Sequence, residues 1–84
     1  MARKNKLAER LKGKPRDFTW DELEKLLSSF GYELAKQGKT GGSRRRFVHP
    51  VAPAISLHKP HPGNILKRYQ VEQIIETLTT EGLL

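Results

Sequence analysis

The strongest structural signal in this sequence is a complete set of helix-start features at residues 18–23. Thr19 is a favourable N-cap residue, and Glu22 three positions later completes a capping box. Phe18 and Leu23 occupy the two positions of a hydrophobic staple that flanks this cap. Few alternatives remain for such a segment, because the features together fix the residue at which a helix begins.

Two segments repeat apolar residues at the helical period of about 3.6. The first stripe consists of Trp20, Leu23, Leu26, Leu27 and Phe30. The second consists of Val71, Ile74, Ile75 and Leu78. They predict helices over about 20–29 and 67–80, which Gly31 and Gly82 end. We interpret Trp20 as a core residue rather than as a platform for base stacking.

Three short strands are expected between the two helices. They are predicted at residues 32–37, 43–49 and 54–58. Glycines at 38, 41 and 42 mark a flexible connection, and Pro60 and Pro62 exclude regular structure after the third strand. The order helix, three-stranded meander, helix predicts an α+β fold with an antiparallel sheet. Both helices then cover one face of this sheet and leave the other face open.

The length of 84 residues suits one small domain, 1–84. We expect residues 17–84 to form its core. Residues 1–16 form either a basic N-terminal arm or a short helix, with Leu7, Ala8 and Leu11 on one side of that helix.

Side-chain alternation along the strands predicts the content of the open face. Phe47, Ile55 and Leu57 should face the helices, and Arg45 then lies on their side near the sheet edge. The residues expected on the open face are Arg44, Arg46, Ser56 and His58. This register is an inference, because a slip by one residue would reverse it.

Positive charge is concentrated in the middle of the chain. The sequence has 16 Lys and Arg against 9 Asp and Glu, a formal net charge of +7. Residues 34–71 contain no acid and eight bases, which are Lys36, Lys39, Arg44, Arg45, Arg46, Lys59, Lys67 and Arg68. Such segregation favours a polyanionic partner, although a solvated basic surface would have the same composition.

Two short motifs resemble a known family. They are GSRRRFVHP at residues 42–50 and HKPHPG at residues 58–63, and the Phe-Thr-Trp helix start at 18–20 adds to them. Together they resemble the HicA toxins of bacterial toxin–antitoxin pairs, which are ribonucleases that cleave mRNA. The resemblance implies a double-stranded-RNA-binding-domain-like fold of order αβββα. It also implies a HicB-type antitoxin as the protein partner.

The sequence departs from this family at the position of the catalytic histidine. Many members place a catalytic histidine directly after the Gly-Ser pair or one residue later, where this chain has Arg44 and Arg45. Arginine stays protonated and cannot act as a general base. His61 matches the histidine of the family's His-Pro loop.

RNA cleavage without a metal needs a base, an acid and positive charge around the phosphate, and histidine and arginine supply these roles. We therefore predict His58 and His61 as catalytic residues. The predicted RNA-binding residues are Lys39, Ser43, Arg44, Arg45, Arg46 and Lys59. His49 is interpreted as a turn residue, and His61 can equally be a residue that only holds its loop. No metal site or cofactor is expected, because cysteine is absent and the surrounding sequence lacks carboxylates.

Three function classes stay open. The leading one is an endoribonuclease toxin that cleaves mRNA and binds an antitoxin. The others are a non-catalytic RNA-binding module or inactive toxin, and an interaction subunit whose basic face only binds its antitoxin. We expect no membrane partner and no small-molecule substrate. The absence of cysteine and of an apolar segment after the basic N-terminus suits the cytoplasm.

Overall fold

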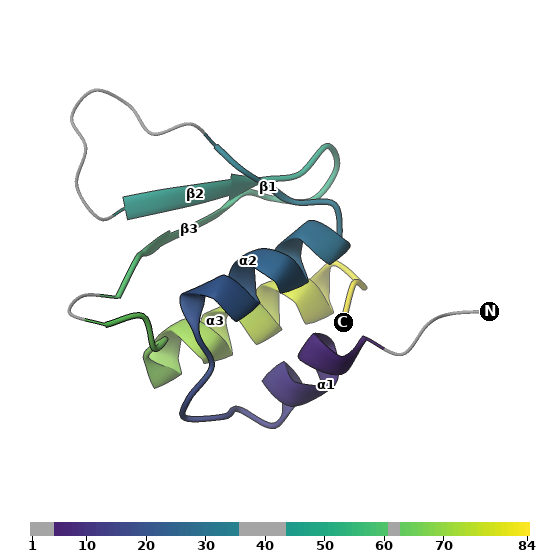
Figure 1. Cartoon of the computed structure of the whole chain (residues 1–84). Helices are drawn as coiled ribbons and strands as arrows, with labels where there is room; N and C mark the ends of the chain where they lie inside the picture. The colour runs from purple at the N-terminus through teal and green to yellow at the C-terminus, as the bar shows by residue number, and fades with distance from the viewer. Residues whose placement is uncertain (1–4, 36–43, 61–62) are drawn as a thin grey trace.

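A computed structural model describes residues 5–35, 44–60 and 63–84 of the chain. In chain order the elements are α1 (Lys6–Lys12), α2 (Trp20–Ser29), β1 (Glu33–Leu34), β2 (Arg44–Val48), β3 (Ile55–His58) and α3 (Arg68–Thr80). Figure 1 shows the sheet as one layer, with α2 and α3 beneath it and α1 below these two helices. In the described ranges, no helix is long and apolar enough to cross a membrane.

The start of α2 has the predicted geometry. The Thr19 side chain accepts a hydrogen bond from the Glu22 backbone N–H at 3.1 Å, and the Glu22 carboxylate accepts one from the Thr19 N–H at 3.0 Å. Phe18 and Leu23 are both completely buried. After the helix, Gly31 has a φ of +96°, a left-handed conformation that favours glycine. The capping box, the staple and the helix end are therefore confirmed.

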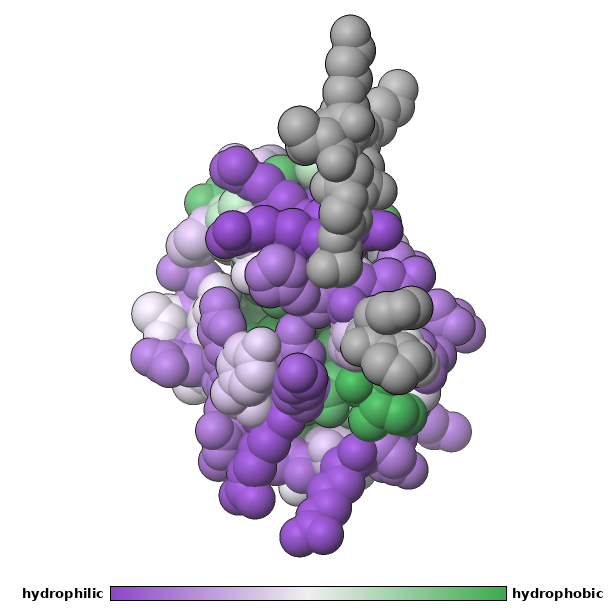
Figure 2. Space-filling model, turned by 90° about the vertical axis from the view of Figure 1, so that its left-hand side faces the viewer, coloured by the Kyte–Doolittle hydropathy of each residue, from purple (hydrophilic) through white to green (hydrophobic). Residues whose placement is uncertain are grey.

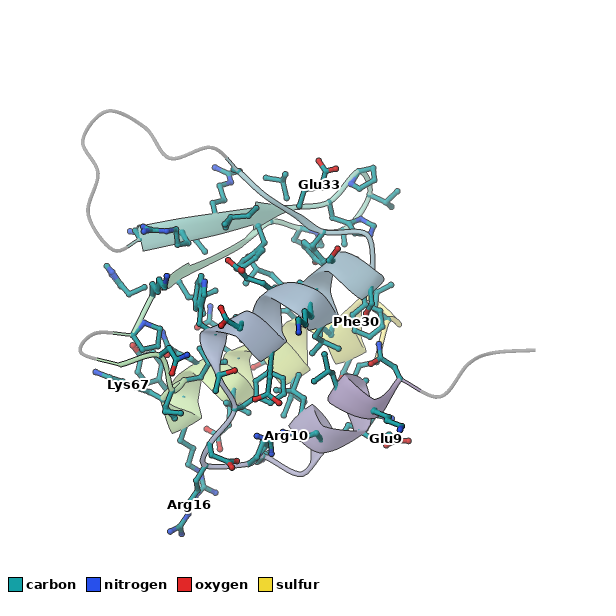
Figure 3. The ribbon with its side chains drawn as sticks, in the orientation of Figure 1. Glu9, Arg10, Arg16, Phe30, Glu33 and Lys67 are labelled. Carbon is teal, nitrogen blue, oxygen red and sulfur yellow. The ribbon has the colours of Figure 1, made fainter. Side chains whose placement is uncertain are left out.

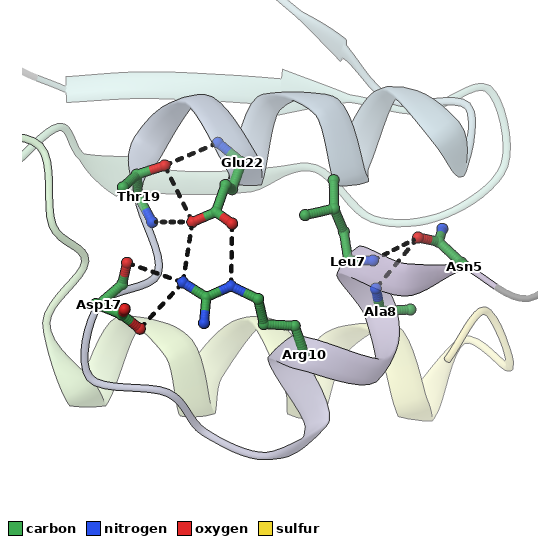
Figure 4. Close-up of polar contacts among 7 residues, drawn as sticks. All are labelled: Asn5, Leu7, Ala8, Arg10, Asp17, Thr19 and Glu22. Carbon is green, nitrogen blue, oxygen red and sulfur yellow. Dashed lines mark hydrogen bonds and ion pairs between the residues drawn. The ribbon is translucent and has the colours of Figure 1, made fainter.

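The N-terminal segment forms a helix. Asn5 caps α1 by accepting from the backbone N–H groups of Leu7 and Ala8, and the helix buries Ala8 and Leu11. Arg10 joins this helix to α2, because its guanidinium donates to the Glu22 carboxylate at 3.0 Å (Figure 4). Of the two predicted alternatives, the short helix is thus the one observed.

The sheet has the strand order β1-β2-β3, and both pairs are antiparallel. Phe47 lies opposite Leu34 on one neighbouring strand and opposite Ile55 on the other. Within the described residues the strands are shorter than predicted: β1 begins at Glu33 and ends at Leu34, β2 ends at Val48, and β3 begins at Ile55. Position 43 and residues 36–37, which the sequence assigned to strands, lie outside the described residues. The predicted α+β architecture is confirmed.

Aromatic packing joins the sheet to the helices. Trp20 is 1% exposed, and its ring centroid lies 5.6 Å from that of Phe47, which is 2% exposed. Ile55 and Leu57 are buried on the same side of the sheet, and Val71 and Ile74 of α3 belong to the same core. Trp20 is therefore a core residue, as predicted, and the helices cover the face that carries Phe47.

A short backbone pairing ties the starts of α2 and α3 together. Residues Thr19 and Ile65 form an antiparallel bridge. The Trp20 N–H donates to the Asn64 carbonyl at 2.7 Å, and the Leu66 N–H donates to the Phe18 carbonyl at 2.8 Å. Both helices therefore begin at the same end of the molecule, next to the end of β3.

Removal of the Glu22 charge should make stability less dependent on pH. Hydrogen bonds from Arg10 and from the Thr19 backbone lower the pKa of the Glu22 carboxyl from 4.5 to about 2. Because the folded state has the lower pKa, this contribution is complete above about pH 4.5 and is lost as the pH falls toward 2. We expect Glu22→Gln to cost roughly 1 kcal/mol at pH 7, with a smaller cost at pH 3. Urea unfolding followed by Trp20 fluorescence measures both values.

Glu76→Gln is the matched control for this experiment. Glu76 is exposed on α3 and forms no ion pair among the described residues. Its substitution should change stability by less than about 0.5 kcal/mol at either pH. Equal effects of the two substitutions at pH 7 would contradict the role assigned to the Arg10–Glu22 contact.

Candidate nucleic-acid interface

Two arginines and a histidine share the open face of the sheet. Arg44 lies directly opposite His58, and Arg46 lies opposite Ser56, in the antiparallel pairing of β2 with β3. Residues in such direct opposition project from the same side of a sheet. Phe47 and Leu57 are buried on the helix side, whereas Arg44, Arg46 and His58 are exposed. The register predicted from alternation is confirmed.

Arg45 lies on the other side of the sheet. It is paired with the buried Leu57 and is itself half-buried, and its guanidinium donates to the Arg44 carbonyl at 3.2 Å. The structure therefore separates Arg45 from the two arginines of the open face. Lys59 directly follows His58 and is exposed. Three predicted site residues, Lys39, Ser43 and His61, lie outside the described residues.

Charge changes sign along the open face. Figure 3 shows Glu33 on the sheet, pointing away from the helices. Glu33 lies opposite Val48, the last residue of β2, whereas Arg44 is the first residue of that strand. The positive side chains thus gather at the end of the sheet where β2 begins and β3 ends. A phosphate group has its most favourable position at that end.

A buried glutamine holds the backbone at His58. Gln70 is 2% exposed, and its side-chain amide donates to the His58 carbonyl at 2.8 Å. The Gln70 carbonyl oxygen accepts from the Lys67 backbone N–H at 3.0 Å. One side chain of α3 therefore fixes both the end of β3 and the start of its own helix.

Sequence reasoning missed Gln70, although the sequence contains a signal for it. Gln70 precedes Val71 on the stripe that α3 buries, and it stands three residues after Lys67, the N-cap position. Glutamine at this spacing can accept from the backbone N–H of the N-cap. A polar residue on a buried stripe needs hydrogen-bond partners, and these partners are His58 and Lys67.

His49 is a turn residue, as the sequence indicated. Its Nδ1 accepts from the backbone N–H groups of Val51 and Ala52 at 3.0 and 2.9 Å. Because Nδ1 is an acceptor, the proton is assigned to Nε2, which lies 3.0 Å from the Phe30 carbonyl. These bonds fasten the turn between β2 and β3 to the end of α2. Both ring nitrogens of His49 therefore contact backbone groups of the turn or of the end of α2. We do not assign His49 to the RNA-binding surface of the open face.

No group of three or more His, Cys, Asp or Glu side chains that could hold a metal ion is found in the described parts of the chain. At the end of the open face where Arg44, Arg46, Ser56 and His58 lie, the polar groups are instead guanidinium, hydroxyl and imidazole. Guanidinium groups bind phosphate oxygens through two parallel hydrogen bonds, and imidazole can transfer a proton. This set suits the binding of a phosphodiester more than that of a neutral or cationic ligand.

A comparison with known protein families identifies the family of this chain. A family described as the HicA toxin of bacterial toxin–antitoxin systems matches residues 20–79. The chain belongs to the HicA toxin family. Neither the curated proteins nor the solved structures gave a match. The HicA segment contains α2, the whole sheet and nearly all of α3, whereas α1 precedes it.

Membership of the HicA family confirms the resemblance seen in the two sequence motifs. It identifies the chain as a member of a family of toxins from toxin–antitoxin systems. Both Arg44 and His58 lie within the HicA match, on facing positions of β2 and β3.

Replacement of Gln70 should destabilise the fold and disturb the end of β3. In Gln70→Met the His58 carbonyl loses a buried donor, and we expect a cost of about 1–3 kcal/mol in free energy of unfolding. Gln73→Met is the control, because Gln73 is exposed on the same helix and its change should cost less than about 0.5 kcal/mol. Urea unfolding followed by Trp20 fluorescence compares them. Equal stability of the two variants would show that the contact with His58 contributes nothing.

Proposed function

We propose that this HicA-family protein is a metal-independent endoribonuclease that cleaves mRNA on the open face of its sheet. The observation that carries the proposal is the direct opposition of Arg44 and His58, both exposed, at the positive end of that face. Family membership adds toxin function within a toxin–antitoxin pair. The proposed protein partner is a HicB-type antitoxin, and the proposed location is the cytoplasm.

The proposed chemistry uses the ribose of the substrate as the nucleophile. A base removes the proton of the 2′-hydroxyl, and the 2′-oxygen attacks the adjacent phosphorus. The bond from phosphorus to the 5′-oxygen breaks, and an acid gives this oxygen a proton. The products are a 2′,3′-cyclic phosphate and a 5′-hydroxyl, so this step consumes no water. Positive side chains stabilise the charge that develops on the phosphate oxygens.

In this proposal His58 exchanges a proton with one of the two reacting oxygens, and His61 assists it. Arg44 lies opposite His58 and would hold the phosphate, with Arg46 one position further along the same face. A guanidinium group cannot act as a general base, so Arg44 cannot replace the histidine that many HicA proteins have at this point of the chain. The remaining proposed RNA contacts are Lys39, Ser43 and Lys59, whereas the half-buried Arg45 lies on the helix side and is not proposed to hold the phosphate on the open face.

Loss of the His58 imidazole should abolish cleavage. A time course with purified protein, a defined mRNA and a chelator of divalent cations should show cutting by the parent. We expect His58→Ala to cut at least about 100-fold more slowly, because a positioned proton-transfer group contributes that much or more. A chemical probe for the 2′,3′-cyclic phosphate identifies the product.

His49→Ala is the matched histidine control. It should lower stability by about 1–2 kcal/mol because it removes the acceptor of two backbone N–H groups, but it should leave the cleavage rate of the folded protein unchanged. Equal cleavage by His58→Ala and the parent would refute the assigned role of His58.

The alternative is a non-catalytic RNA-binding module. The observation in its favour is Arg44, which stands where many HicA proteins have a catalytic histidine. In the same time course this alternative predicts no cleavage by the parent, together with tight and salt-sensitive binding to the RNA.

The two exposed arginines should contribute to RNA affinity through phosphate contacts. For a single strand, the slope of log K against log salt falls by roughly 0.7 in magnitude for each phosphate contact that is lost. We expect this change for Arg44→Ala and for Arg46→Ala. Lys25→Ala, on the exposed side of α2, should leave the slope unchanged. Unchanged slopes in both arginine variants would place RNA on another surface.

A further inference from the structure

A second basic site lies between the α1–α2 connection and the start of α3. It is a cleft with a volume of about 290 Å³. Its lining residues are Lys14, Pro15, Arg16, Leu66, Arg68 and Val71. Lysine and arginine side chains contribute the charge, whereas the leucine, valine and proline provide apolar surface.

The cleft has an excess of positive charge. Glu72 of α3 is the acid beside it, with its carboxylate 3.8 Å from the Lys14 ammonium and 3.4 Å from the Arg68 guanidinium. One carboxylate therefore faces two cations. Within the described ranges, Arg16 pairs with no acid and is exposed. A negatively charged ligand would offset this excess of positive charge.

The connection that carries Lys14 and Arg16 is held in place from both sides. The Arg10 guanidinium donates to the Asp17 carboxylate at 3.0 Å and to the Asp17 carbonyl at 3.1 Å (Figure 4). At the other end, the Lys14 backbone N–H donates to the Leu11 carbonyl at 2.8 Å. The basic side chains are thus presented by a fixed segment, which lowers the cost of ordering them on a ligand.

Lys14 has a conformation that lysine disfavours. Its φ of +51° is left-handed, and Lys14 is the one residue other than glycine with a positive φ among the described residues. Glycine would adopt this conformation without strain. The neighbouring Gly13 instead has a right-handed φ of −76°. The backbone at position 14 would therefore favour glycine. What lysine adds at this position is a positive charge beside the cleft.

The cleft lies at the same end of the molecule as the positive end of the sheet. The start of α3 follows β3 closely in Figure 1. Figure 3 shows Lys67 projecting from this end, whereas Arg16 projects from below the helices, on the side away from the sheet. Figure 2 views that end directly, and polar side chains cover most of it around a small apolar area. An RNA strand bound on the open face would reach the cleft by passing over this end of the molecule.

We infer that this cleft is a second binding site for RNA, which takes a phosphodiester on Lys14, Arg16 and Arg68 and a base or ribose on the apolar floor. The inference rests on the proposed function in one respect, namely that RNA is the ligand of the open face. The exposed cations Lys59 and Lys67, at the end of β3 and the start of α3, lie between the open face and the cleft, and they favour RNA over an acidic protein segment as the occupant. Lys14 and Arg16 precede the part of the chain that the HicA family matches, whereas Leu66, Arg68 and Val71 lie within it.

A salt titration of RNA binding tests the inference. The ligand is a single-stranded 2′-O-methyl RNA of about 20 nucleotides, which lacks the attacking hydroxyl and cannot be cut. The variants are Lys14→Gly, Arg16→Gln and the double variant, with Lys25→Gln as the control for loss of one exposed charge. Each cleft substitution should reduce the magnitude of the salt slope by roughly 0.7, and the double variant by about 1.4.

Lys14→Gly separates binding from folding. Glycine relieves the left-handed conformation, so this variant should be at least as stable as the parent while it binds RNA more weakly. Weaker binding to RNA together with unchanged stability supports the site.

Two results would overturn the inference. One is RNA affinity and salt slope in the double variant equal to those of Lys25→Gln. The other is unchanged RNA binding with weakened binding of the antitoxin, which would make the cleft a protein interface. A parent that binds RNA without cleaving it would contradict the proposed nuclease activity alone, because the slopes of the cleft variants would still be measured.

Discussion

The contact between Trp20 and Phe47 determines which face of the sheet packs on the helices and which face stays open. Phe47 is the buried residue of β2, and its packing against Trp20 of α2 places one side of the strand on the core. Neighbouring side chains of a strand alternate between faces, so Arg46 must point to the open side. A slip by one residue would bury an arginine and expose a phenylalanine. Hydrophobic burial therefore determines which charges can meet a substrate.

Two further contacts fix the ends of the strands relative to the helices. Gln70 connects α3 to the His58 carbonyl, and His49 connects the β2–β3 turn to the end of α2. Arg10 adds α1 to the same unit through Glu22, whose carboxylate also completes the cap of α2. The open face is thus supported by side chains on the opposite side of the sheet. The basic cleft lies between the α1–α2 connection and the start of α3.

Local patterns were sufficient to predict most of the fold. The capping box at Thr19 and Glu22 and the apolar stripes depend on residues close in sequence, and for this reason the helix bounds agreed with the structure. Alternation placed Arg44 and His58 on one face because Phe47 was taken as the residue of the second strand that faces the core, and the structure has this register. The hydrogen bond from Gln70 to the His58 carbonyl and the cleft at Lys14 join residues distant in sequence. No periodicity reports such pairings, so they required the structure.

The most direct test of the open face as the RNA surface is an NMR titration of the 15N-labelled protein. The ligand would be a 2′-O-methyl RNA, which binds but cannot be cleaved. The account predicts the largest shift changes at the amides of β2 and β3 around Arg44, Arg46 and His58, with small changes on the exposed side of α2 near Lys25. Changes centred on that side of α2, with the strands unaffected, would contradict it.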